Sequence, residues 1–163
     1  MKKIKPKKGQ ESVWDYPRPP KLEAVNKELI VEFDDIQIVK TNGAFRVLET
    51  SHPPVYYIPQ QDIQMNYLRE SEGRSSFCEF KGAATYWDIV TPNKASLQAA
   101  WSYSSPTSLF QPIANYLAFY ASRVDACYVD GELVQSQEGD FYGGWITKDI
   151  VGPFKGGAGT WGW

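Results

Sequence analysis

The sequence predicts a mainly β fold in which two antiparallel sheets are accompanied by one amphipathic helix. Aromatic residues make up 15% of the 163 residues, and 11 prolines and 13 glycines break the chain at short intervals. Between these breaks, short stretches alternate apolar and polar residues, which is typical of strands joined by turns.

The first elements are expected to be a hairpin and a third strand. Apolar residues alternate on both sides of Asp34-Asp35 within residues 28–40, which predicts a hairpin with its turn at the two aspartates. Asn42-Gly43 tolerates the positive φ values of a type I′ turn and is expected to start a further hairpin. The next strand would then be Ala44 to Glu49.

The later segments are assigned in the same way. Strands are predicted at 55–58, 75–81, 85–90 and 96–103, and a helical turn followed by a strand at 60–68. Apolar residues recur at helical spacing from Ile113 to Val124, and Pro112 suits a first turn, which predicts an amphipathic helix over about 112–124. Asp130-Gly131 is expected to be the turn of a last hairpin.

The chain divides by composition into a domain and two arms. Residues 1–27 form a basic, Pro-rich arm, residues 28–137 the domain, and residues 138–163 a Gly/aromatic arm that we expect to pack on the domain. Five lysines in the first ten residues leave 12 basic and 19 acidic side chains elsewhere, a charge of −7. This acidic body argues against nucleic-acid binding.

The counts of histidine and cysteine exclude several kinds of site. One histidine and two cysteines cannot form a four-cysteine zinc site or a site of several histidines, so no metal and no cofactor is expected. Cys78 and Cys127 are expected to be unpaired, and a reducing cytoplasm is the default location. No apolar run is long enough to span a membrane. The oligomeric state stays open, and a homodimer is compatible with the sequence.

A group of charged residues lies among strand aromatics, where a ligand cleft is expected. Aromatic walls with a few placed charges are typical of small-molecule sites. The candidate ligand-binding residues are Arg46, Glu49, Tyr56, Tyr57, Lys81, Trp101 and Tyr103. Arg46 is suited to clamp a carboxylate or phosphate, and the equally weighted alternative is a structural ion pair with Glu49 or Asp62.

Three other features are interpreted as structural. His52 lies before Pro53-Pro54 and is expected at a surface turn. Cys78 is expected to be a buried structural cysteine. The glycines at 156–159 lack the spacing of a phosphate-binding loop, so close backbone packing is the favoured interpretation.

Four ordered blocks of the sequence resemble domain-of-unknown-function family 427. The blocks are 46–62, 78–86, 99–103 and 116–125, with the runs RVLET, PPVYYIP, CEFKGAA, AAWSY and YLAFY, and the resemblance covers roughly residues 29–135. It implies a β-tent-like fold, two antiparallel sheets that meet at an angle over a ligand cleft. Many β-tent proteins hold zinc on two C-x-x-C pairs, which this chain lacks. The C-terminal arm resembles a cyanobacterial type of extension found in part of the family.

Three functions are consistent with these observations. The first is binding of a small anionic or carbonyl-containing ligand in the aromatic cleft. The second is an enzyme in the same cleft, with Glu49 or Asp62 as base and with Arg46 and Lys81 stabilising negative charge. The third is a protein-interaction module that uses the C-terminal arm.

Overall fold

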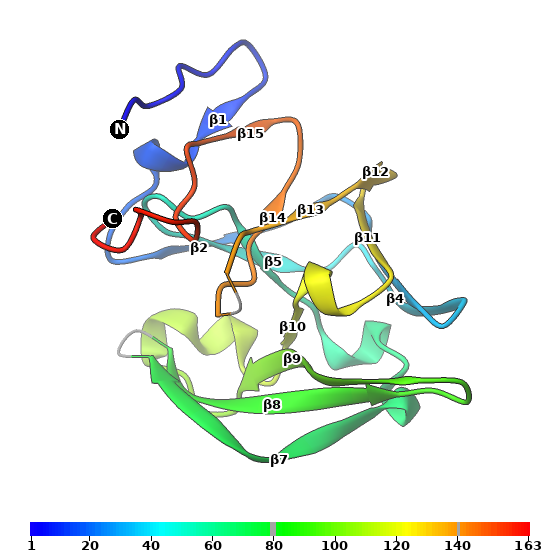
Figure 1. The fold of residues 1–163 in the computed structure, drawn as a ribbon. Coiled ribbons are helices and arrows are strands. Elements are labelled where there is room, and N and C mark those ends of the chain that lie inside the picture. Colours follow the sequence, from blue (N-terminus) through cyan, green and yellow to red (C-terminus); the bar gives the residue numbers. More distant parts are fainter. Residues whose placement is uncertain (79–80, 140) are drawn as a thin grey trace.

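The computed structural model describes residues 1–78, 81–139 and 141–163, and it confirms a mainly β fold with antiparallel sheets (Figure 1). One four-stranded sheet has the order β12-β11-β3-β4 and another has the order β10-β9-β8-β7. A three-stranded sheet has the order β2-β5-β6. The predicted strand at 75–81 includes residues 79 and 80, which lie outside the described residues.

The structure contains short strands joined by turns and 3-10 helices. The strands of the three larger sheets are β2 (Lys21–Ala24), β3 (Leu29–Phe33), β4 (Ile36–Thr41), β5 (Phe45–Leu48), β6 (Val55–Tyr57), β7 (Leu68–Cys78), β8 (Gly82–Val90), β9 (Ala95–Tyr103), β10 (Leu117–Phe119), β11 (Ala126–Val129) and β12 (Glu132–Leu133). Two smaller pairs join β1 (Glu11–Ser12) to β15 (Ile150–Val151) and β13 (Gln135–Ser136) to β14 (Trp145–Ile146). Short 3-10 turns connect them: η1 (Val13–Asp15), η2 (Gln60–Asp62), η3 (Met65–Tyr67), η4 (Ser108–Ile113) and η5 (Ala121–Arg123).

Two hairpin turns are confirmed. Asp34 and Asp35 have φ values of 55° and 57° between β3 and β4, and Asp130 and Gly131 have 46° and 80° between β11 and β12. Positive φ at both central positions matches the right-handed twist of paired strands, as in a type I′ turn.

The hairpin predicted at Asn42-Gly43 is wrong, because the strands on either side belong to different sheets. The Gly43 amide donates to Thr41 Oγ1 at 3.0 Å, and that hydroxyl donates to the Asp62 carboxylate at 2.6 Å. These side-chain bonds stabilise a corner between two sheets, and β5 pairs with β2 and β6 instead of β4.

The amphipathic helix predicted over 112–124 is also wrong. The segment contains the end of η4, the strand β10 and the turn η5. Leu117 exchanges two backbone hydrogen bonds with Ile58, and β10 pairs with β9. All three residues of β10 are buried, so this short strand has an apolar run that spacing alone cannot tell from a helix face.

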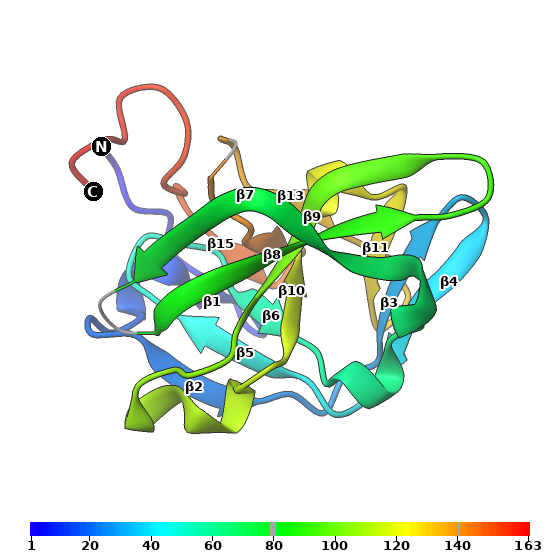
Figure 2. The same cartoon turned by 90° about the horizontal axis from the view of Figure 1, so that it is seen from below.

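The core has two main parts, which the sheets enclose. One cluster contains Leu29, Val31 and Phe119, and a second lies around Tyr57 and Trp101. Seen from below, β7 and β8 are nearest the viewer, and β5 and β6 lie deeper in the view (Figure 2). The second cluster contains residues of β5, β6, β8 and β9. The second cluster thus forms where the three-stranded sheet faces β8 and β9.

The C-terminal arm is packed against the domain. Trp145 is 1% exposed, its ring centroid lies 5.2 Å from that of Tyr56, and its indole donates to the Phe119 carbonyl at 2.9 Å. The two ends of the chain lie near each other (Figure 1), consistent with the pairing of β1 and β15. None of the helices in the described part of the chain is long and apolar enough to cross a membrane.

Candidate functional site

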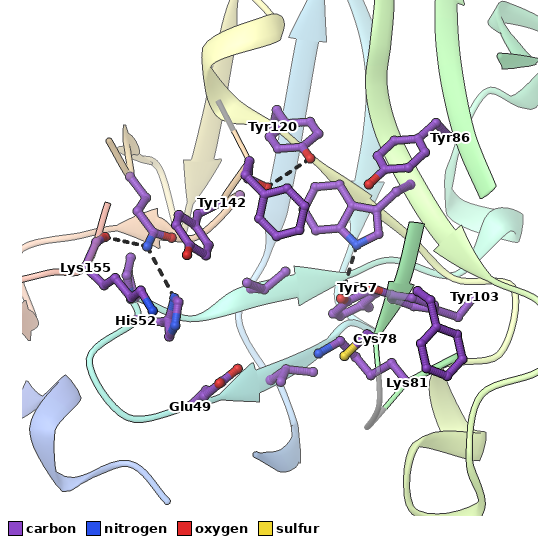
Figure 3. Close-up of a pocket in the computed structure, with 18 residues that line it drawn as sticks. Glu49, His52, Tyr57, Cys78, Lys81, Tyr86, Tyr103, Tyr120, Tyr142 and Lys155 are labelled. Carbon is purple, nitrogen blue, oxygen red and sulfur yellow. Dashed lines mark hydrogen bonds between the residues drawn. The ribbon is translucent and has the colours of Figure 1, made fainter. Parts of the chain in front are cut away.

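A cavity of about 300 Å³ lies between β5–β6 and β8–β9, and the C-terminal arm forms part of its wall (Figure 3). Its lining combines aromatic rings with a small number of charged and polar groups. The residues that line it include Glu49, His52, Tyr57, Cys78, Lys81, Tyr86, Trp101, Tyr103, Tyr120, Gln137, Tyr142, Gly143 and Lys155.

Five of the seven candidate residues predicted from the sequence line this cavity, and two do not. Glu49, Tyr57, Lys81, Trp101 and Tyr103 are brought together. Arg46 and Tyr56 instead line a separate depression beside β2. Consecutive side chains of a strand point to opposite faces, so Val47 and Tyr57 face the cavity while their neighbours Arg46 and Tyr56 face away.

Arg46 is held in a structural ion pair, although its partners differ from the predicted Glu49 and Asp62. Its guanidinium lies 2.6 Å from Glu11 Oε1 and 2.7 Å from Glu23 Oε1. Burial alone would raise the pKa of Glu11, but hydrogen bonds from Arg46 and Tyr16 outweigh it and the pKa falls below its usual value. Arg46 therefore ties β1 and β2 to β5.

Of the two carboxylates proposed as a base, one reaches the cavity. Glu49 lines it, with 27% of its side chain exposed and Arg18 Nε at 3.7 Å. Asp62 lies on η2 and accepts the hydrogen bond from Thr41 described above. Its carboxylate stabilises the corner after β4.

Tyrosine hydroxyls and one indole form the inner wall. Trp101 donates its indole N–H to the Tyr57 hydroxyl at 3.3 Å, and the Tyr120 hydroxyl donates to the Phe141 carbonyl at 3.1 Å. Burial raises the pKa of both Tyr57 and Tyr103 above that of a free phenol, so both hydroxyls stay protonated at neutral pH. The wall can therefore donate hydrogen bonds.

Lys81 brings a cation to the cavity. The residue is 9% exposed, and its ammonium lies 6.0 Å from the ring centroid of Tyr103 and 5.7 Å from that of Phe110. Within the described residues, no carboxylate lies within 4.0 Å of this ammonium. Its neighbours are thus ring faces, which stabilise a cation less than a carboxylate would.

Two residues that the sequence assigned to structural roles also line the cavity. His52 was expected at a surface turn, but it is half-buried, with its ring centroid 5.1 Å from that of Tyr142. Cys78 was expected to be buried, but it is partly exposed in the cavity wall. The position of Cys78, three residues before Lys81, was the sequence signal that could have placed Cys78 in the cavity wall.

The remaining wall comes from the C-terminal arm, which sequence reasoning did not assign to the site. Tyr142, Gly143 and Lys155 come from this arm, Gln137 directly precedes it, and no motif marks these four residues. Gly143 lies so close to Trp101 that an added β-carbon would be 2.2 Å from Cη2. Only glycine allows the arm to approach the indole at this distance.

Neither thiol is in a disulfide, and no metal centre is formed by the described side chains. Cys78 and Cys127 are both free, and burial raises the pKa of the Cys127 thiol. Across residues 1–78, 81–139 and 141–163, no group of three or more His, Cys, Asp or Glu side chains could hold a metal ion.

The fold and the site together define a mainly β protein with an aromatic cleft that carries a buried lysine. Residues 21–130 match the family described as domain of unknown function DUF427, and the chain belongs to that family. A search among curated proteins found no match. The cavity residues of the C-terminal arm lie beyond residue 130, outside the matched region.

Proposed function

We propose that the protein binds a small molecule carrying an anionic or carbonyl oxygen in the aromatic cavity. The observation that carries this proposal is the Lys81 ammonium. Burying a charge is unfavourable unless a partner compensates for it, and the described carboxylates do not supply one. A ligand oxygen would supply the missing partner.

The size and lining of the cavity agree with this class of ligand. About 300 Å³ is at the lower end of the range for small-molecule sites. Trp101 and Tyr103 offer flat apolar surface, while the tyrosine hydroxyls offer hydrogen-bond donors. A planar molecule with one polar end matches these features.

The test is a binding experiment with three compounds that share one ring. Benzoate, benzamide and benzylamine carry an anionic, a carbonyl and a cationic head group, and binding is followed by tryptophan fluorescence because Trp101 lines the cavity. Benzoate and benzamide are expected to bind more tightly than benzylamine. Native mass spectrometry of freshly purified protein would show whether a ligand is retained.

Lys81→Met should weaken benzoate binding at least tenfold, since a charge-assisted hydrogen bond is worth about 1.5–3 kcal/mol. Lys40→Met is the matched control, because Lys40 is exposed on β4 and does not line the cavity. Tighter binding of benzylamine than of benzoate, or an equal loss in both variants, would contradict the proposal.

We also propose a reducing, cytoplasmic location, which the two free thiols support.

A further inference from the structure

Gln137 connects the C-terminal arm to the cavity through hydrogen bonds that define how its amide is oriented. The Gly144 amide donates to Gln137 Oε1 at 3.1 Å, and Gln137 Nε2 donates to the Lys155 carbonyl at 2.6 Å. A backbone N–H can only donate and a backbone carbonyl can only accept. The oxygen of the Gln137 amide must therefore face Gly144, and its nitrogen must face Lys155.

The same amide nitrogen lies 3.4 Å from Nδ1 of His52 (Figure 3). Because an amide NH₂ group donates and does not accept, the facing ring nitrogen must carry a lone pair. Gln137 is 3% exposed, so rotating its amide would leave buried polar atoms without partners. The contact thus selects the form of His52 in which Nδ1 is unprotonated.

The charges around His52 agree with a neutral ring. Burial, followed by the positive charges of Lys155, Arg18 and Lys81, lowers the pKa of His52 to about 4. Glu49 and Tyr142 are the other titratable residues near His52 in the cavity wall. A neutral imidazole carries one proton, and with Nδ1 unprotonated that proton is on Nε2.

We infer that Gln137 holds His52 as the neutral Nε2–H tautomer, and that this N–H is a specificity-determining donor to an oxygen of the bound ligand. Within the described residues, no hydrogen bond engages Nε2. The inference deepens the proposed function, on which its second half rests. Lys81 and His52 would both donate, so the polar end of the ligand must accept, as a carboxylate or carbonyl oxygen does. Gln137 acts here as a positioning residue.

The tautomer can be measured without any ligand. The chain has one histidine, so the ring nitrogens of uniformly ¹⁵N-labelled protein give one unambiguous set of NMR signals. At pH 7, Nδ1 is expected to show the shift of an unprotonated nitrogen and Nε2 that of a protonated one. Protonation of Nδ1 in the wild-type protein would overturn the inference, whatever the ligand result.

Gln137→Glu tests the role of Gln137. A carboxylate beside Nδ1 can only accept, so the Nδ1 signal should move to that of a protonated nitrogen in the folded variant. An unchanged tautomer would show that Gln137 does not set it. The wild-type spectrum decides the tautomer itself even if this variant does not fold.

His52→Phe tests the contact with the ligand. It should weaken benzoate and benzamide binding about tenfold and leave benzylamine binding unchanged. Gln10→Leu serves as control, because Gln10 does not line the cavity. Equal affinity of wild type and His52→Phe for benzoate would overturn this half. If none of the three compounds binds, the inferred contact between His52 and the ligand is contradicted together with the proposed function. The NMR result on the tautomer is unaffected.

Discussion

A β-carbon at Gly143 would lie 2.2 Å from Cη2 of Trp101, so the C-terminal arm passes the cavity indole at backbone distance. This close approach makes the arm part of the cavity wall. It also means that the position of Trp101 and the path of the arm depend on each other.

Gly143→Ala should therefore lower the free energy of unfolding by about 1–3 kcal/mol, because overpacking forces either the indole or the backbone to move. Urea unfolding measures the stability, and tryptophan fluorescence reports any shift of the indole. Gly162→Ala is the control, since no atom lies within 4 Å of a β-carbon there. Equal stability of the two variants would contradict the close packing.

Replacing Arg46 should affect stability and leave ligand binding unchanged. Arg46→Met removes the partner of Glu11 and Glu23, whose side chains are 37% and 39% exposed, and should cost about 1–3 kcal/mol. Lys94→Met is the control, because the side chains of its pair with Asp125 are 43% and 45% exposed, and it should cost less than about 1 kcal/mol. A loss of benzoate affinity in Arg46→Met would show that Arg46 does contact the ligand.

His52 should give the protein a measurable pH dependence. Its folded pKa, about 4, lies below the unfolded value near 6.5, so the unfolded chain binds an extra proton between these values. Stability should then fall by on the order of 2 kcal/mol as the pH drops from about 6.5 to about 4. Chemical unfolding at several pH values measures this slope, and His52→Phe should flatten it in the upper part of that window, where carboxylates have not yet titrated.

Trp145 should be far more important for stability than Trp161, although both belong to the C-terminal arm. Trp145→Ala removes a ring that is 1% exposed and should cost about 3–5 kcal/mol, whereas Trp161 is 93% exposed and Trp161→Ala should change stability by less than about 0.5 kcal/mol. If Trp145→Ala does not fold, Trp145→Phe removes the hydrogen bond to the Phe119 carbonyl together with part of the ring, and it should cost less than Trp145→Ala but more than Trp161→Ala. Similar losses at the two positions would mean that the arm is not packed as described.

The sequence predicted those parts of the fold that depend on local chemistry. Asp34-Asp35 and Asp130-Gly131 form hairpin turns because aspartate and glycine tolerate positive φ. The same reasoning failed at Asn42-Gly43, where one hydrogen bond from Gly43 to Thr41 and another from Thr41 to Asp62 stabilise a corner between sheets. It failed again at 112–124, because Leu117 pairs with Ile58, a residue distant in the sequence.

The sequence by itself also determined which residue types could form a site, since it placed Tyr57, Lys81 and Trp101 among strand aromatics. Tertiary structure decided which of them share a cavity. The alternation of side chains along β5 and β6 turns Arg46 and Tyr56 to the opposite face, and the register of the neighbouring strands determines which face is the cavity. Lys155 reaches the same cavity only because the arm folds back over it, and Gln137, just before the arm, donates to the Lys155 carbonyl there. This arrangement is a consequence of long-range packing that no local pattern encodes.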